Sequence, residues 1–425
     1  MSARHYLFAV VDGGGNVPAE LSAARGLVGR GHAVTVLAED SVAADVRSAG
    51  AVLRRWERAP NRPDRKPAND PSRDWECKYP WQLVDRLLET IIIGPAERYA
   101  EDVAQTIEET SPDLVVCSMF CVGGMIAAER AGVPFDVAFS TIYPLPAKGI
   151  PPFGTGLGPA RTFVGRWRDR ALNVLAERLW NKGVTRLNAL RSEYGLPPLV
   201  RFLDQLRRAR RQLVLTSAAF DFSGTLPANA RYVGPVLDDP VWAERVSWTP
   251  PPGGDPLVLV AMSSTYQDQL ATLQRVIDAL GTLPVRAVVT TGPALDPAAL
   301  QPRANVTVVP SAPHRQVLQQ AALVVTHGGH GTVIKALAAG VPVIVLPHGR
   351  DQADVAARVT SRGAGLGLKR NAGAAVIAGA VTRILRNDSY RAAARRLGEA
   401  VRRDARSDAL IRELEEIPET RARAS

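Results

Sequence analysis

The sequence predicts an α/β protein built from two similar-sized units, each with a parallel β-sheet covered by helices. Two series of short apolar runs alternate with helical patterns, one in the first third of the chain and one from residue 257 onward. A proline- and glycine-rich stretch lies between them, within residues 236–254. The chain has 425 residues, and at about 100–200 residues per domain this length accommodates two domains with large cores.

The first series begins with a βαβ unit. Residues 6–11 form a short apolar run, a glycine turn follows, and residues 18–30 have a helical pattern with Pro18 in its first turn. Residues 33–38 form the next apolar run, so the unit predicts two parallel strands joined by a helix. Two further strands of this sheet are expected at residues 114–117 and 137–139.

Long connections separate the first series from the second. Prolines are frequent in segments 60–80 and 144–159, where we expect irregular loops, and an arginine-rich helical region covers 164–211. Long loops on an α/β scaffold often contribute to function. The strands of the second series are expected at residues 257–262, 285–290, 306–309, 323–326 and 343–346. The predicted divisions are an N-terminal domain (1–235), a linker (236–254), a C-terminal domain (255–390) and a helical tail (391–425) that packs back on the N-terminal domain.

Composition narrows the classes of function. The net charge is +10, yet 46 of the 52 basic residues are arginines, scattered along the chain. This scatter does not predict nucleic-acid binding, although a positive field would attract a phosphorylated small substrate. No apolar stretch approaches the ~18–20 residues of a membrane span, and three cysteines are too few for a disulfide framework. We therefore expect a cytoplasmic protein without a membrane span.

The first of two glycine-rich turns follows the first strand. Its sequence is Asp12-Gly-Gly-Gly-Asn-Val-Pro, and bare amides in such a turn can approach an anion or another ligand. Because Pro18 stands in the place of the third glycine, it is not a dinucleotide fingerprint, which disfavours a nicotinamide-dependent oxidoreductase. Two interpretations stay open here: a tight strand-to-helix turn, and part of an active-site cleft.

The second glycine turn carries the stronger signal. A strand runs into His327-Gly-Gly-His-Gly-Thr, and we expect a helix to start near Thr332, with this residue as its cap. Glycine amides at the positive end of a helix dipole form a diphosphate site, to which His327 would add a positive charge. The next strand delivers Asp351 and Gln352 to the same edge, where a carboxylate and an amide can hold sugar hydroxyls.

The run HGGHGTVIKALAAGVPVIVLPHGRDQADVAARV, residues 327–359, resembles the donor-binding signature of family 1 inverting glycosyltransferases of the bacterial natural-product type. Segments 30–37, 112–116 and 231–236 resemble other parts of the same family. The resemblance implies the GT-B fold, in which two Rossmann-like βαβ domains face each other across a cleft. It further implies an N-terminal acceptor-binding domain and a C-terminal nucleotide-sugar-binding domain.

The activity implied by the resemblance is metal-independent, inverting transfer of a hexose or deoxyhexose. The donor would be a dTDP- or UDP-sugar acting as co-substrate without a further cofactor, and the acceptor a hydrophobic natural product such as a polyketide or aromatic aglycone. The hexose would be held by Asp351 and Gln352. The remaining implied donor-binding residues are Ser264, His327, Gly329, Gly331 and Thr332.

The family's catalytic dyad is missing from this sequence. Its histidine falls on Gly15 and its aspartate partner on Ser118, and neither residue can accept a proton near neutral pH. Three interpretations follow. Asp12 is the base, with a raised pKa or an acidic nucleophile; the acceptor is nucleophilic enough alone; or the chain is a catalytically silent homologue that partners an active transferase. Asp12 has an alternative structural role, an Asx turn that caps the glycine loop.

The expected donor and acceptor sites also have local departures and alternatives. Where many members stack a tryptophan on uracil, this chain has Ser311-Ala-Pro-His, and the glutamate that often binds ribose is Lys335, which leaves room for dTDP-deoxysugars. An apolar acceptor wall is expected between the domains, with core packing as the alternative for each member. The candidates are Trp75, Trp81, Met119, Phe120, Tyr143 and Phe153. The oligomeric state is not predicted, and a homodimer stays open.

Overall fold

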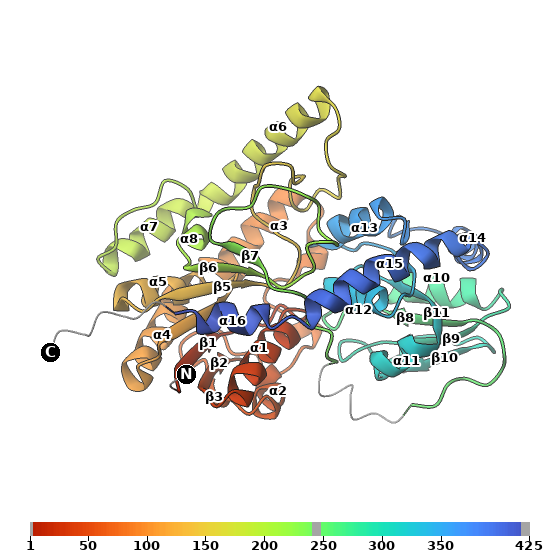
Figure 1. Ribbon diagram of the computed structural model, residues 1–425, viewed down its shortest axis with the longest axis horizontal. Helices are drawn as coiled ribbons and strands as arrows, with labels where there is room; N and C mark the ends of the chain where they lie inside the picture. Colours follow the sequence, from red (N-terminus) through yellow and green to blue (C-terminus); the bar gives the residue numbers. More distant parts are fainter. Residues whose placement is uncertain (1–2, 240–247, 418–425) are drawn as a thin grey trace.

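The structure is a computed structural model that describes residues 3–239 and 248–417, and it consists of two lobes placed side by side (Figure 1). Within the described residues, the N-terminal lobe holds a seven-stranded parallel sheet with the order β3-β2-β1-β4-β5-β6-β7. Its strands are β1 (His5–Ala9), β2 (Ala33–Ala38), β3 (Val52–Arg55), β4 (Leu114–Ser118), β5 (Phe135–Phe139), β6 (Arg211–Val214) and β7 (Ala230–Tyr232).

The C-terminal lobe holds a six-stranded parallel sheet in the same described part of the chain, with the order β10-β9-β8-β11-β12-β13. Its strands are β8 (Leu257–Ala261), β9 (Arg286–Thr290), β10 (Val306–Val309), β11 (Ala321–Thr326), β12 (Val343–Val345) and β13 (Gly365–Gly367). Strands β4, β5 and β8 are buried at every position, as expected for parallel strands with helices on both faces.

Helices cover both sheets and connect the parallel strands (Figure 1). Those of the N-terminal lobe are α1 (Val17–Gly29), α2 (Ala43–Ser48), α3 (Pro80–Leu87), α4 (Ala96–Thr110), α5 (Val122–Ala131), α6 (Phe163–Trp180), α7 (Val184–Glu193) and α8 (Asp204–Arg207). Those that follow β8 are α10 (Leu270–Leu280), α11 (His314–Gln320), α12 (His330–Ala338), α13 (Gln352–Ser361), α14 (Ala374–Leu385), α15 (Asp388–Ala405) and α16 (Ala409–Glu415).

The strand order reverses once in each sheet, between β1 and β4 and between β8 and β11. In open α/β sheets a crevice forms at the carboxyl ends of the strands at such a reversal, because the flanking helices lie on opposite faces of the sheet. The two glycine turns predicted as functional follow β1 and β11, so both lie at these reversals.

The predicted fold class is confirmed, and the strands expected from apolar runs are present with small shifts in their ends. Four strands were missed: β3, β6, β7 and β13. β3 is an edge strand with Val52 63% exposed, and β13 is Gly-Leu-Gly, so neither forms a long apolar run. The region 164–211 is not one helical stretch: three helices separated by turns occupy it, and β6 begins at its end.

The last two helices connect the lobes. α15 packs on α12 of the C-terminal lobe, and α16 crosses to contact α1 (Figure 1). Arg30 of the N-terminal lobe forms ion pairs with Asp408 and Glu415, at 2.9 and 3.1 Å. Part of the expected linker, residues 240–247, and the end of the expected tail, residues 418–425, lie outside the described residues. None of the helices described here is both long and apolar enough to cross a membrane.

Candidate functional site

A cavity of about 810 Å³ lies between the two lobes. Its walls include the turn after β1, the segment after β4, the segment after β8, and the loops after β11 and β12. All of these segments leave the carboxyl ends of parallel strands, which is where α/β proteins bind ligands. The cavity therefore collects the two glycine turns and the Asp351 loop into one site.

The second glycine turn presents the start of α12 to this cavity. α12 begins at His330 with Gly329 as its N-cap, which corrects the expected start near Thr332. Thr332 thus lies in the first turn of the helix and is not its cap, although it lines the cavity with Gly329 and Gly331. Free amides at this helix start favour an anion, as the sequence predicted.

Two glycines of this turn are required by geometry. Gly328 has φ +101°, a conformation that L side chains rarely adopt. A Cβ atom added to Gly329 would lie 2.7 Å from Nε2 of His327, so any side chain there would displace the imidazole. The turn consequently holds backbone and imidazole closer together than any other residue type would permit.

His327 lines the cavity but does not carry the charge that we expected. Burial lowers its pKa to about 3, and the positive charges of His348 and Arg350 act in the same direction. The imidazole is therefore neutral near pH 7, which corrects the prediction of a positive partner for diphosphate. Its Nδ1 lies 3.3 Å from Oγ1 of Thr326, and a hydrogen bond from the ring to the Ala261 backbone opposes the lowering of the pKa.

Asp351 and Gln352 lie at the start of α13, in the loop that lines the cavity. The Asp351 carboxylate accepts a hydrogen bond from the Thr141 hydroxyl of the N-terminal lobe. The Gln352 amide donates to Oε1 of Gln267 at 2.7 Å and accepts from the backbone N–H of His348 at 2.7 Å. Asp351 therefore bridges the lobes, whereas the side chain of Gln352 is already satisfied within its own lobe.

Ser264 lines the cavity in the segment that follows β8. Gly14 of the first turn has φ +90°, and a Cβ there would lie 2.7 Å from Cγ2 of Thr265 and 3.4 Å from Oγ of Ser264. The predicted phosphate-contacting serine therefore stands opposite the first glycine turn.

Lys335 also lines the cavity, where it forms an ion pair with Asp239. Its Nζ lies 2.9 Å from Oδ1 of Asp239, a second cavity-lining residue that the sequence did not single out. A lysine–aspartate pair therefore stands at the position where the family resemblance implies a glutamate. A carboxylate oxygen of Asp239 can accept a bond from a hydroxyl where the lysine has only donors.

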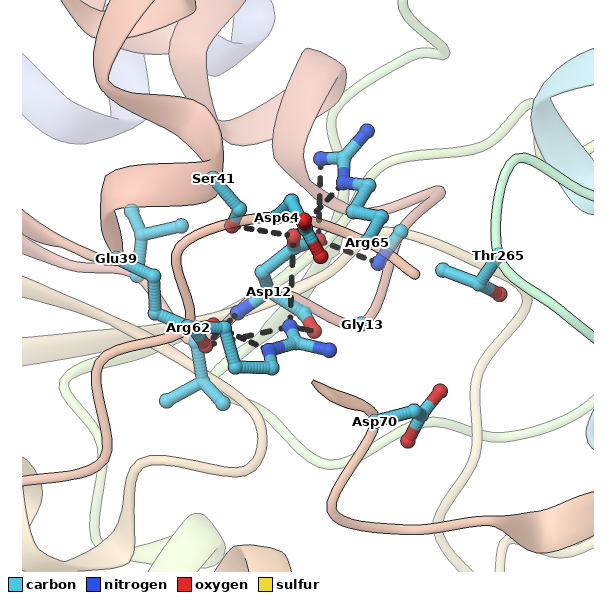
Figure 2. A network of polar contacts seen from close by, with 12 residues as sticks. Asp12, Gly13, Glu39, Ser41, Arg62, Asp64, Arg65, Asp70 and Thr265 are labelled. Carbon is cyan, nitrogen blue, oxygen red and sulfur yellow. Dashed lines mark hydrogen bonds and ion pairs between the residues drawn. The ribbon is translucent and has the colours of Figure 1, made fainter. Parts of the chain in front are cut away.

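Asp12 is enclosed by cations (Figure 2). Its Oδ2 lies 2.8 Å from Nε of Arg65 and 3.4 Å from Nη2 of Arg62, and it accepts a hydrogen bond from Ser41 at 3.0 Å. Burial acts to raise the pKa of this carboxyl, but the charges of Arg65 and Arg62 outweigh it and hold the pKa below its usual value. The raised pKa that a base role calls for is therefore contradicted.

The alternative role of Asp12 is confirmed. The backbone N–H of Gly14 donates to its Oδ1 at 2.8 Å, which is the Asx turn that caps the glycine loop. A carboxylate held by two arginines and an amide is a weak proton acceptor, so this geometry disfavours Asp12 as the base.

The residues predicted for the apolar acceptor wall lie in three different environments. Trp75, Met119, Phe120 and Phe153 line the cavity. Tyr143 does not: it is 1% exposed in the core of the N-terminal lobe and donates to Oε1 of Gln212 at 2.8 Å, which corrects its predicted place on the wall. Trp81 is also corrected, because it is 48% exposed and stacks on Tyr79 at 4.5 Å.

Side chains from helices α3 and α6 complete the apolar wall of the cavity. The sequence analysis did not predict their contribution. Cavity-lining residues from these helices are Leu83, Val84, Leu87, Leu172, Leu175, Ala176, Leu179 and Trp180. Among the charged cavity residues that sequence reasoning missed are Glu20 on α1 and Arg350 after β12. Arg350 spans the lobes, with Nε 2.5 Å from Oδ2 of Asp74 and Nη1 3.2 Å from the carbonyl oxygen of Gly13.

Comparison with known proteins gives this site its family. Residues 274–417 match the family described as "Erythromycin biosynthesis protein CIII-like, C-terminal domain". A 4'-demethylrebeccamycin synthase of Lentzea aerocolonigenes is 32% identical over 329 residues, covering 75% of this chain and 77% of that protein. A PGL/p-HBAD biosynthesis rhamnosyltransferase of Mycobacterium bovis (strain BCG / Pasteur 1173P2) is 30% identical, covering 72% and 68%. The chain belongs to the natural-product glycosyltransferase family.

Solved structures agree on the fold of this glycosyltransferase. A glycosyltransferase of kitacinnamycin superposes with a TM-score of 0.76 at 21% identity, covering 97% of each chain. A calicheamicin glycosyltransferase superposes with a TM-score of 0.74 at 24% identity, covering 98% of each chain. The predicted GT-B fold and the resemblance are confirmed, and a nicotinamide-dependent oxidoreductase is set aside.

Proposed function

We propose that this glycosyltransferase moves a hexose or deoxyhexose, with inversion, from a dTDP- or UDP-sugar to a hydrophobic natural-product acceptor. The observation that carries the proposal is a single cavity that joins the α12 glycine turn to an apolar wall. The diphosphate would lie against the amides of Gly329 and Gly331, with Thr332, His327 and Ser264 beside it. The hexose would lie near Asp351 and Gln352.

The leaving group would be stabilised mainly by fixed dipoles. As the bond from the anomeric carbon to the diphosphate breaks, negative charge grows on the phosphate oxygen. The N-terminus of α12 carries partial positive charge, and His327 lies beside it. The amides of this helix start are held in place by the fold, so they respond to the developing charge without reorganising.

A thymine nucleotide is the preferred donor base in this proposal. Lys335 replaces the family's ribose glutamate, and no tryptophan stands at Ser311 to stack on uracil. Among the structural neighbours, a spinosyn rhamnosyltransferase is described as complexed with thymidine diphosphate and the glycosyltransferase VinC as in complex with dTDP.

The acceptor side supports a flat apolar substrate. Trp75, Phe120 and Phe153 contribute rings to the cavity, and α3 and α6 contribute aliphatic side chains. The names of several relatives support the same class: the synthase from Lentzea aerocolonigenes is named for rebeccamycin, and the structural neighbours for calicheamicin and spinosyn.

Titration calorimetry with dTDP, UDP and GDP tests the donor part of the proposal. We expect micromolar binding of dTDP, weaker binding of UDP, and a loss of at least tenfold in affinity for His327→Ala. Binding of none of the three by the wild-type chain would contradict the proposal and return the silent-homologue interpretation.

A further inference from the structure

Glu20 is a buried carboxylate at the cavity that forms no salt bridge with any residue that the structure describes. Glu20 lies in the first turn of α1, is 2% exposed and lines the cavity. Its Oε2 accepts a hydrogen bond from the Ser118 hydroxyl at the end of β4, and its Oε1 accepts from Nδ2 of Asn16 at 3.0 Å. The hydroxyl of Ser140, after β5, lies 3.5 Å from Oε1. Three segments of the N-terminal lobe therefore aim donors at one carboxylate.

The two oxygens of Glu20 face different surroundings. Oε2 contacts Ser118, which is 1% exposed and does not line the cavity. Oε1 contacts Asn16 and Ser140, and both of these residues line the cavity. Oε1 is thus the oxygen nearer to a bound acceptor.

The position of Glu20 coincides with that of the missing dyad. Ser118 occupies the sequence position of the family's aspartate, and Gly15 that of its histidine. A Cβ added at Gly15 would meet no atom within 4 Å, so the backbone leaves room there for a side chain to begin. Glu20 follows Gly15 along the chain, on α1, and its carboxylate contacts Ser118.

The electrostatics of Glu20 are opposite to those of Asp12. Burial raises the pKa of Glu20 to about 7; the hydrogen bonds from Ser118, Asn16 and Ser140 oppose this shift, and the charge of Asp12 adds to it. The charge of Glu20 in turn contributes to raising the pKa values of the buried thiols of Cys117 and Cys121. Within residues 3–239 and 248–417 no basic side chain forms a salt bridge with Glu20. A group that titrates near the working pH is suited to general base catalysis.

We propose that Glu20 is the general base of this glycosyltransferase and replaces the absent histidine–aspartate dyad. The inference rests on the proposed transfer to an acceptor with a protic nucleophile. Oε1 takes the proton from the acceptor hydroxyl or N–H group. The freed electron pair forms the bond to the anomeric carbon, and the bond to the diphosphate oxygen breaks with its electrons on that oxygen. Ser118 and Asn16 are positioning residues that orient the carboxylate.

Two phenolic acceptors distinguish an effect on proton removal from an effect on any other step of the reaction. 4-Methoxyphenol is protonated near pH 7, whereas 2-chloro-4-nitrophenol is ionised and supplies its own nucleophile. With the nucleotide sugar that calorimetry selects, Glu20→Gln should lower turnover of 4-methoxyphenol by ~10²–10⁴-fold and that of 2-chloro-4-nitrophenol by less than about tenfold. The pH profile of wild-type kcat/KM with 4-methoxyphenol should have an ascending limb near 7 that the variant lacks.

Asp12→Asn is the matched control, because it removes a carboxylate from the adjacent turn. Its effect should differ between the two phenols far less than that of Glu20→Gln, since Asp12 is held by Arg62 and Arg65 and acts on Glu20 only through its charge. Equal losses for both phenols in Glu20→Gln, or no loss for either, would overturn the base assignment. So would an acceptor-dependent loss in Asp12→Asn as large as that in Glu20→Gln.

Restoring the family dyad provides a gain-of-function test. Gly15→His and Ser118→Asp, added to Glu20→Gln, should recover at least tenfold of the lost turnover with 4-methoxyphenol. Recovery is expected because Gly15 has a negative φ and open space around its Cβ. A triple variant that binds dTDP and folds but recovers nothing would indicate that the dyad position and Glu20 do not serve the same step, contrary to the proposal.

A direct titration keeps this inference separate from the donor proposal. Infrared difference spectra of wild type minus Glu20→Gln should contain a carboxyl band that disappears with a midpoint near pH 7. This measurement needs no donor or acceptor. A midpoint near 4 would overturn Glu20 as the base even if dTDP binds, whereas absence of dTDP binding with a midpoint near 7 would overturn only the donor proposal.

Discussion

The two glycine turns stand across one cavity, yet they are built in opposite ways. The turn after β11 derives its properties from the backbone: Gly328 and Gly329 permit a close approach, and α12 begins at once. The turn after β1 derives its properties from distant side chains, since Arg62 and Arg65 come from a loop some fifty residues away. A backbone-built site is visible in a short stretch of sequence, whereas a side-chain network becomes visible only in the fold.

The largest loss of stability is expected from removing the negative charge of Asp12, which contacts Arg62, Arg65 and Ser41. Asp12→Asn leaves Arg62 and Arg65 without a carboxylate that they now share, and breaking a buried ion pair costs about 3–5 kcal/mol of the free energy of unfolding. Urea denaturation at pH 7 measures this loss. Asp255→Asn is the matched control: its side chain is exposed, and it should change stability by less than about 0.5 kcal/mol. Similar stability for the two variants would contradict the network's role.

The second largest effect is expected from adding a side chain at the close approach in the turn after β11. Gly329→Ala places a Cβ 2.7 Å from Nε2 of His327, so the imidazole or the turn must move. We expect about a hundredfold loss of dTDP affinity in calorimetry, with the fold retained. Gly379→Ala on α14, where an added Cβ meets nothing within 4 Å, should leave the affinity unchanged. If Gly329→Ala bound dTDP normally, the turn would not contact the diphosphate.

The two carboxylates beside the first turn should respond to pH with opposite signs. The pKa of Asp12 is lowered in the folded chain, so its contribution to stability is present above the unfolded-state pKa and is lost as pH falls through the folded-state value. The pKa of Glu20 is raised to about 7, so its ionisation destabilises the fold as pH rises from about 5 to 8.

Denaturation curves across pH 3–8 measure both slopes. Relative to wild type, Asp12→Asn should lose least at the acid end, and Glu20→Gln should gain stability toward pH 8. Curves with the same slope for both variants would mean that the two carboxylates have similar environments.

The smallest effect is expected on the apolar wall. Trp75 lines the cavity and packs edge-on against Tyr266 with ring centroids 5.0 Å apart, and such aromatic contacts contribute about 0.5–1.5 kcal/mol. Trp75→Ala should raise the KM for a phenolic acceptor by roughly two- to tenfold and leave dTDP affinity unchanged. Trp81→Ala, the same substitution outside the cavity lining, should leave both values unchanged. Equal effects of the two substitutions would remove Trp75 from the acceptor wall.

The same contrast explains what could be predicted from the sequence. Apolar runs such as 257–262 located most strands, because buried parallel strands need continuous apolar side chains. The segment 327–352 located the donor side, since its glycines, strands and helix are consecutive. The charge state of His327 could not be predicted, because it depends on burial by segments elsewhere in the chain.

The sequence pattern of α1 already indicated that Glu20 is unusual, although the sequence analysis did not use it. On α1 it lies three residues after Val17 and four before Ala24, and all three share the buried face of the helix. An acidic residue at an apolar position of an amphipathic helix is unusual and indicates a functional or paired group. Its partner Ser118 lies 98 residues away, so the pairing itself required the fold.

The chain passes between the lobes twice, and the two passes touch. Gly234, just before the first pass, has φ +83°, and a Cβ there would lie 2.3 Å from the carbonyl oxygen of Asp404, just before the second. Arg350 and Asp74 form an ion pair across the cleft, and the buried pair of Arg358 and Asp221 is a second one. Any separation of the lobes would have to break both pairs.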